Sequence, residues 1–180
     1  MLRVFDNHFF SKLNRDEIKQ WIKNNYTLLI GSAIFTKNNS ITSKVVRWAE
    51  SWKCEDKSFI PSHTGSIIEY NNEIYIFDMK PLRASVQPLL DYLCDTKDDY
   101  KIILRNFEIN THTFNSLIID KIGELYPFMS AIRSVFTKRR TKYKQHCSEA
   151  HARCLKLSGY EFKEGFNFEC TPEELYNYFI

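Results

Sequence analysis

A β-hairpin is the feature that most constrains the fold of this chain. Two strand-like segments, residues 63–70 and 73–79, are separated by only two residues, Asn71 and Asn72. Asparagine tolerates the positive φ of a two-residue hairpin turn, so the segments predict two paired antiparallel strands. Pairing the residues on either side of the turn fixes the register, because the numbers of facing residues then always sum to 143.

This register places a carboxylate beside a histidine. Side chains alternate along a strand, so His63, Gly65 and Ile67 share one face with Asp78, which lies opposite Gly65. Asp78 is then the diagonal neighbour of His63, close enough to hold the imidazole in one tautomer and orientation. Glu69 lies on the same face, but six residues of strand separate it from His63 by roughly 20 Å, which excludes it.

A cysteine at the start of a later helix supplies the partner of this histidine. Cys147 immediately precedes an amphipathic segment, Ser148 to Leu157, for which Gly159 is the expected stop. The unpaired N–H groups and the positive end of a helix dipole stabilise a thiolate, and the same N–H groups can bind an oxyanion. A neighbouring imidazole would act as its base. The histidine precedes the cysteine, which is the reverse of the order in papain.

The remaining pattern predicts a single α+β domain over residues 1–180, with a small antiparallel sheet packed with helices. Capping signals begin two helices, at Asn14 with Glu17 and at Thr171 followed by Pro172. Apolar spacing predicts further helices over 41–52, 88–93, 113–125 and 128–136, and further strands over 26–36 and 101–106. Gly31 is expected where two segments approach closely, and the aromatic excess, including Trp21, Trp48 and Trp52, is assigned to the core.

Composition narrows the class of protein. A chain of 180 residues that is 43% hydrophobic suffices for one core, and no apolar run reaches the length of a membrane-spanning helix. No apolar signal segment follows Met1, and the five cysteines form no regular framework, so reduced thiols in a cytoplasm are expected. Carriage elsewhere by a partner, or into a virion, stays open. The net charge of +3 does not favour a nucleic-acid partner, and no cofactor is expected.

A zinc site near Cys147 is weighed and set aside. His146, Cys147, His151 and Cys154 are residue types that bind zinc. The last three follow i, i+4, i+7 spacing, which spans two helical turns and does not let all of them reach one ion. No metal is therefore expected, and Cys154 is assigned to the core.

A basic segment over residues 138–144 has two explanations. It contains Arg139, Arg140, Lys142 and Lys144 and lies immediately before Cys147. It is either a solvated loop or a rim that attracts an anionic substrate, a phosphate headgroup or nucleic acid.

Short motifs occur along the chain in a recognisable order. They are Gly31 to Thr36, Ser62-His63-Thr64-Gly65, Ile76-Phe77-Asp78, His146-Cys147-Ser148-Glu149 and a closing Thr171 to Leu175. Together they resemble the circularly permuted, papain-like branch of the NlpC superfamily, the YiiX-like proteins, and more distantly the lecithin retinol acyltransferase group. The resemblance covers about residues 28–178. Ser32 stands where the family often has Asp, and Asp78 where it often has the longer Glu.

The resemblance implies a permuted papain-like fold and a thiol hydrolase or acyltransferase. Cys147 would attack the carbonyl of an amide or ester, His63 would relay protons, and Asp78 would orient His63. Family substrates range from peptidoglycan stem peptides to lipid acyl groups and protein amides, and the sequence does not select among them. Two other classes stay open: a non-catalytic structural or interaction module, such as a virion or assembly component, and an anion- or nucleic-acid-binding module that uses residues 138–144.

Overall fold

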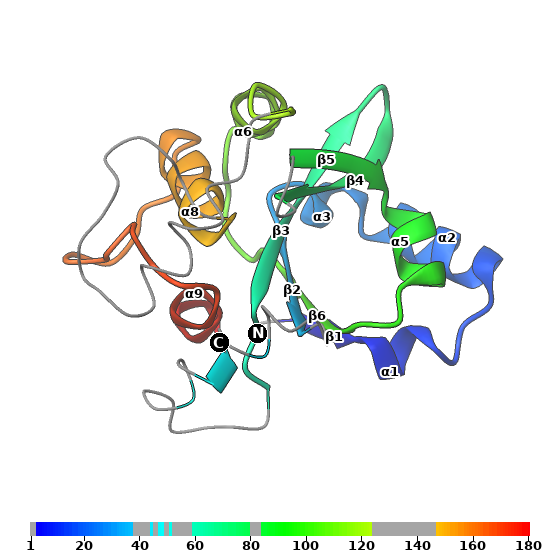
Figure 1. The fold of residues 1–180 in the computed structure, drawn as a ribbon. Coiled ribbons are helices and arrows are strands. Elements are labelled where there is room, and N and C mark those ends of the chain that lie inside the picture. The colour runs from blue at the N-terminus through cyan, green and yellow to red at the C-terminus, as the bar shows by residue number, and fades with distance from the viewer. Residues whose placement is uncertain are drawn as a thin grey trace.

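The α+β class is confirmed by the computed structural model, which describes residues 3–37, 44, 47–48, 51, 59–79, 84–123 and 147–180 (Figure 1). The sheet is antiparallel, with strand order β1-β6-β2-β3-β4-β5. The strands are β1 Arg3–Asp6, β2 Ala33–Lys37, β3 His63–Tyr70, β4 Glu73–Met79, β5 Ala84–Pro88 and β6 Asp99–Leu104. The helices are α1 Asn7–Phe10, α2 Arg15–Asn24, α3 Tyr26–Leu29, α5 Leu89–Asp95, α6 Thr111–Ile119, α8 Cys147–Leu157 and α9 Pro172–Phe179.

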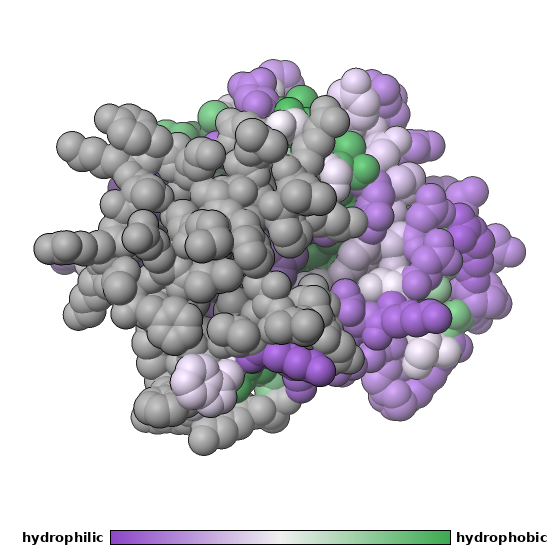
Figure 2. All heavy atoms as spheres, viewed as in Figure 1, coloured by the Kyte–Doolittle hydropathy of each residue, from purple (hydrophilic) through white to green (hydrophobic). Residues whose placement is uncertain are grey.

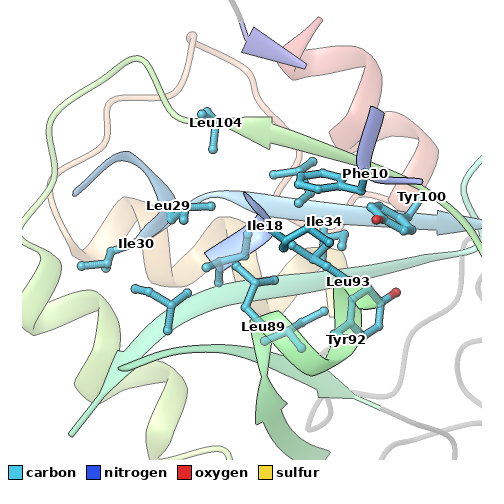
Figure 3. Packing of buried hydrophobic residues seen from close by; sticks show 14 residues of the cluster. Phe10, Ile18, Leu29, Ile30, Ile34, Leu89, Tyr92, Leu93, Tyr100 and Leu104 are labelled. Atoms are coloured by element: carbon cyan, nitrogen blue, oxygen red, sulfur yellow. The ribbon is translucent and has the colours of Figure 1, made fainter. Parts of the chain in front are cut away.

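The central strands are buried on both faces. On one face, Ile34, Ile67 and Ile76 pack with residues of α1, α2 and α5, and Figure 3 shows this cluster from close by. On the other face, Phe35 and Ile68 pack beneath α6, α8 and α9 (Figure 1). The outer surface of the α1, α2 and α5 layer is mostly hydrophilic in Figure 2, as expected for amphipathic helices that bury one side.

The hairpin forms as predicted. Strands β3 and β4 have the predicted bounds, and Ser66 faces Phe77, which is the predicted register. Asn71 and Asn72 have φ values of 51° and 61°, so both adopt the left-handed conformation that a tight hairpin turn requires.

The capping signals also mark the helix ends correctly. Both capping boxes form, at Asn14 with Glu17 and at Thr171 with Glu174. Helix α8 ends before Gly159, which has a φ of +99°. These signals depend on neighbours in the sequence, which explains why they could be read without tertiary information.

The strand predicted over residues 26–36 is wrong in its first half. Residues 26–29 form α3, and the strand begins only at Ala33. A short apolar run fits a buried helical turn as well as a strand, and here a following turn ends with Gly31 at a φ of +83°. Gly31 is the expected point of close approach, because a Cβ there would lie 2.4 Å from Ile109 Cδ1.

Other boundaries also differ from prediction. Helix α6 ends at Ile119 rather than near residue 125, α5 begins one residue after Pro88, and β1, α1 and β5 were not predicted. Trp48 is 56% exposed, so its assignment to the core is wrong. Of the helix predicted over 41–52, only residues 44, 47–48 and 51 are described, while Trp52 and the helix predicted over 128–136 lie outside the described residues. Within the described chain, no helix has the length and apolar character needed to cross a membrane.

Candidate functional site

The candidate site lies where the start of α8 meets the start of β3 on one face of the sheet (Figure 1). Cys147 is the first residue of α8, one position earlier than the predicted helix start, and is only 5% exposed. The hydroxyl of Ser148 donates a hydrogen bond of 2.6 Å to the carbonyl of Cys170. This bond ties the beginning of α8 to the segment that leads into α9.

His63 and Asp78 meet across the hairpin. His63 Nε2 is hydrogen-bonded to Asp78 Oδ1, as the diagonal register predicts, and their side chains are 18% and 11% exposed. Glu69 faces Ile74 near the turn of the hairpin and contacts Tyr26 instead, so the structure also supports its exclusion. The carboxylate therefore fixes the orientation of the His63 ring and leaves its other nitrogen for another partner.

The Cys147 sulfur is that other partner. Burial raises the pKa of Cys147, but the charge and hydrogen bond of His63 outweigh this effect and lower the pKa below that of a free cysteine. Burial likewise lowers the pKa of His63, but the Cys147 thiolate and then Asp78 hold it well above its usual range. Each group therefore favours the charged form of the other.

Backbone N–H groups add to the stabilisation of this thiolate. Hydrogen bonds from the backbone of Thr64 and of Ser148 both lower the pKa of Cys147. One N–H comes from β3 and the other from the first turn of α8, where helix N–H groups have no partner within the helix. A thiolate at Cys147 is thus met by donors from two elements.

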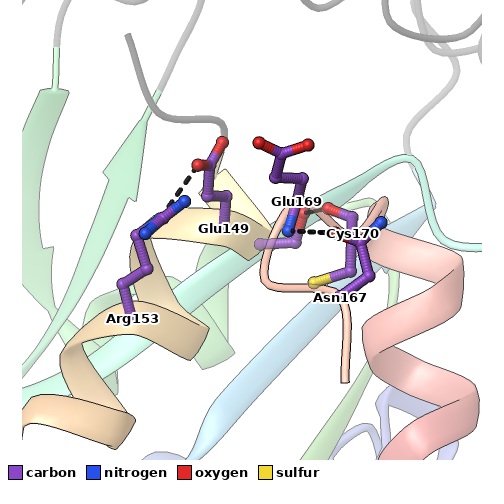
Figure 4. A network of polar contacts seen from close by, with 6 residues as sticks. Glu149, Arg153, Asn167, Glu169 and Cys170 are labelled. Carbon is purple, nitrogen blue, oxygen red and sulfur yellow. Dashed lines mark hydrogen bonds and ion pairs between the residues drawn. The ribbon is translucent and has the colours of Figure 1, made fainter. Parts of the chain in front are cut away.

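A short segment before α9 flanks the start of α8 (Figure 4). In it, the N–H of Glu169 donates to Asn167 Oδ1 at 3.1 Å, while on α8 Arg153 Nε donates to Glu149 Oε1 at 2.9 Å. Burial is the main cause that raises the pKa of Cys170, in the same segment, to about 12. No local pattern predicts that this segment contacts the candidate site, because the contact joins residues more than 20 positions apart.

The proposed zinc ligands do not converge in the part of the chain that is described. His151 Nδ1 is hydrogen-bonded to Ser66 Oγ at 2.8 Å, and Cys154 is buried in an apolar cluster, as expected for a core residue. No group of three metal-binding side chains is present among the described residues. His146 and the basic residues Arg139, Arg140, Lys142 and Lys144 lie outside the described residues, so neither explanation of the 138–144 segment is tested.

Thr64 is a neighbour of the cysteine that sequence reasoning missed. Its side chain is 2% exposed, and its Oγ1 has no hydrogen-bond partner among the described residues. The family motif draws attention to His63 and Gly65 on either side of it, whereas its own side chain points to the opposite face of the strand.

No family model and no curated protein matches this chain. The resemblance to permuted papain-like proteins therefore depends on the order of the motifs and not on a measured relationship.

Proposed function

We propose that the protein is a cysteine-dependent hydrolase or acyltransferase that acts on an amide or ester bond through a thioester on Cys147. The observation that supports this most strongly is that Asp78 is hydrogen-bonded to His63, and His63 in turn lies beside Cys147 and lowers its pKa. It combines a nucleophile, a base and an orienting carboxylate in one buried site, which is the arrangement that acyl transfer by a thiol requires.

In the first step, the Cys147 thiolate attacks the carbonyl carbon and forms a tetrahedral oxyanion. The nearby backbone N–H groups lower the energy of this anion. The intermediate collapses as the bond to the leaving amine or alcohol breaks, and the His63 imidazolium gives its proton to that leaving group. His63 is then neutral and the acyl group is held as a thioester.

In the second step, neutral His63 takes a proton from the acceptor, which is water in a hydrolase or a second nucleophile in a transferase. The acceptor oxygen or nitrogen attacks the thioester carbon, the C–S bond breaks, and the thiolate–imidazolium pair is restored. Asp78 stabilises the charged ring at both ends of the cycle.

We further propose peptide, peptidoglycan-like or acyl compounds as substrates, and a cytoplasmic site of action. The support for a reducing compartment is that Cys94, Cys147 and Cys170 are free thiols.

A burst assay with p-nitrophenyl acetate tests the proposal. Wild-type protein should release p-nitrophenolate in a burst equal to the protein concentration and gain one acetyl group, which peptide mapping should locate on Cys147. Cys147→Ala should lose both the burst and the acetyl group. Cys94→Ala is the matched control, because Cys94 is exposed and lies outside the site; it should behave as the wild type.

An acetyl group that persists in Cys147→Ala, or that maps to Cys94, would show that the site is assigned wrongly. Absence of any burst in folded wild-type protein would favour the alternative of a non-catalytic structural module.

A further inference from the structure

A cavity lies on the side of the sheet that α8 and α9 cover, at the end of β2 and β6 away from His63. Its volume is about 200 Å³, and its walls come from the start of β2, the end of β6, α8, α9 and the residues after α8. This volume corresponds to roughly seven water molecules, which is enough for a small organic ligand. Its lining includes Arg105, His151, Tyr160, Tyr178 and Phe179.

Arg105 brings a buried positive charge to this cavity. The residue is 9% exposed, and three of its guanidinium N–H groups donate to the backbone carbonyls of Ile30 at 2.7 Å, Phe107 at 2.5 Å and Thr27 at 2.7 Å. A guanidinium has five N–H groups, so two donate to none of the described residues. Within the described chain, no carboxylate lies within ion-pair distance of Arg105. Burial lowers the pKa of Arg105, and the charge of Glu108, which forms no ion pair with it, partly offsets this effect.

His151 adds a second polar group without a full set of partners. Its ring is completely buried and its Nδ1 is bonded to Ser66, but its Nε2 has no hydrogen-bond partner among the described residues. Buried polar atoms without partners are rare and point to a missing partner or ligand. Arg105, directly after β6, and His151, on α8, thus line the same cavity.

Aromatic side chains form much of the remaining wall. Phe107, Tyr160 and Phe179 pack against one another, with ring centroids 3.9 Å apart for Phe107 and Tyr160. The hydroxyls of Tyr160 and Tyr178 are hydrogen-bonded to each other. One end of the cavity is therefore cationic and the rest is lined by rings, which suits a ligand with one anionic group and a small flat apolar body.

We propose that this cavity binds a small carboxylate, held by Arg105 and packed against the aromatic wall. A single carboxylate matches the single guanidinium of Arg105, which forms no ion pair with a described residue, and hydrogen bonds between two charged groups are stronger than neutral ones. The site is separate from the candidate nucleophile, because Cys147, His63 and Asp78 are not among the residues that line the cavity. The inference therefore does not depend on the proposed function.

Titration calorimetry with benzoate tests the inference on the full-length protein. Benzoate should bind at one site, and benzamide, which has the same ring and no charge, should bind at least about ten-fold more weakly, because it cannot pair with the guanidinium. Inorganic phosphate lacks a group for the aromatic wall and should also bind at least about ten-fold more weakly.

Asn106 offers a variant that should not disturb folding, because it is exposed and lines the cavity next to Arg105. Asn106→Glu places a carboxylate of the chain itself beside the guanidinium and should weaken benzoate binding by about ten-fold or more. Asn106→Gln is the matched control of the same size and should bind benzoate as the wild type does.

Equal binding of benzoate and benzamide, no benzoate binding, or equal effects of Asn106→Glu and Asn106→Gln would each overturn the inference. Phosphate that binds as tightly as benzoate would overturn the preference for a carboxylate. Acetylation of Cys147 in both Asn106 variants should stay unchanged, which keeps this test distinct from that of the proposed function.

Discussion

Two histidines are buried between β3 and α8, and their surroundings drive them in opposite directions. His63 has a pKa well above its usual range, whereas burial lowers the pKa of His151 to about 3. His63 faces a thiolate and a carboxylate; His151 faces the hydroxyl of Ser66 and the rings of Phe114 and Phe179. Burial alone favours a neutral imidazole, and only charged partners reverse that preference.

Two buried cysteines, Cys147 and Cys170, also differ in the direction of their pKa shifts. Cys170 is buried without an imidazole beside it, and its pKa rises to about 12, while the pKa of Cys147 is lowered by His63. Each member of the Cys147–His63 pair thus depends on the other for its charge. A reactive thiol in this fold requires the pair, because neither burial nor the helix start is sufficient.

Replacing each histidine in turn should have the largest effect, because only His63 is expected to control the reactivity of Cys147. In His63→Gln, Cys147 loses its counter-charge and should resemble Cys170, so alkylation by iodoacetamide at pH 7 should slow by at least about a thousand-fold, ten-fold for each unit of pKa. Mass mapping of the labelled peptide measures the rate at Cys147. His151→Gln is the control, one helical turn away, and should react at nearly the wild-type rate. Similar slowing in both variants would show that the reactivity reflects packing rather than the charged pair.

Acid should affect the two histidines differently as well. The pKa of His151 is about 3 in the folded state and 6.5 in the unfolded state, so the unfolded state binds more protons below pH 6.5. The folded protein therefore has its full stability above pH 6.5, where His151 is neutral in both states. As the pH falls towards 3, the free energy of unfolding decreases, by about 3 kcal/mol between pH 7 and pH 4.5. Urea midpoints at these two pH values give the loss of free energy of unfolding.

The comparison that isolates His151 is again between variants. His151→Gln should lose about 3 kcal/mol less than the wild type over this pH range, because it has no imidazole to protonate. In His63→Gln, where His151 is still present, the free energy of unfolding should still fall by the amount that His151 causes. If His151→Gln and the wild type lose the same free energy of unfolding, His151 is not the buried neutral group described above.

The hairpin end of the site was predictable because its determinants are local. The turn at Asn71 and Asn72 sets the register of β3 and β4, and the register brings Asp78 to His63. The start of α8 at Cys147 was also visible in its amphipathic pattern. That these two elements meet could be expected only from the family motifs, because no local signal joins residues 63 and 147.

The cavity beside Arg105 and His151, at the other end of the interface between α8 and the sheet, was not predicted. Arg105 bonds carbonyls in α3, in the turn after it and in the segment after β6, and His151 bonds β3, so the cavity depends on contacts between distant segments. The error over residues 26–36 has the same origin. A short apolar run does not distinguish a helical turn from a strand until its packing partners are known.

The smallest expected effect concerns the group that makes His63 differ from His151. Asp78→Asn keeps the size and a hydrogen bond but removes the negative charge, so the pKa of His63 should fall and alkylation of Cys147 at pH 7 should slow by about ten-fold. The effect is smaller than that of His63→Gln because the imidazole itself stays beside the thiol. Asp78→Glu restores the charge and should recover most of the rate. Glu69→Gln removes a carboxylate on the same strand face but far from the ring, and it should leave the pH–rate profile of Cys147 unchanged. A shift of that profile in Glu69→Gln, or none in Asp78→Asn, would mean that the field at His63 comes from the net charge of the hairpin rather than from the hydrogen-bonded carboxylate.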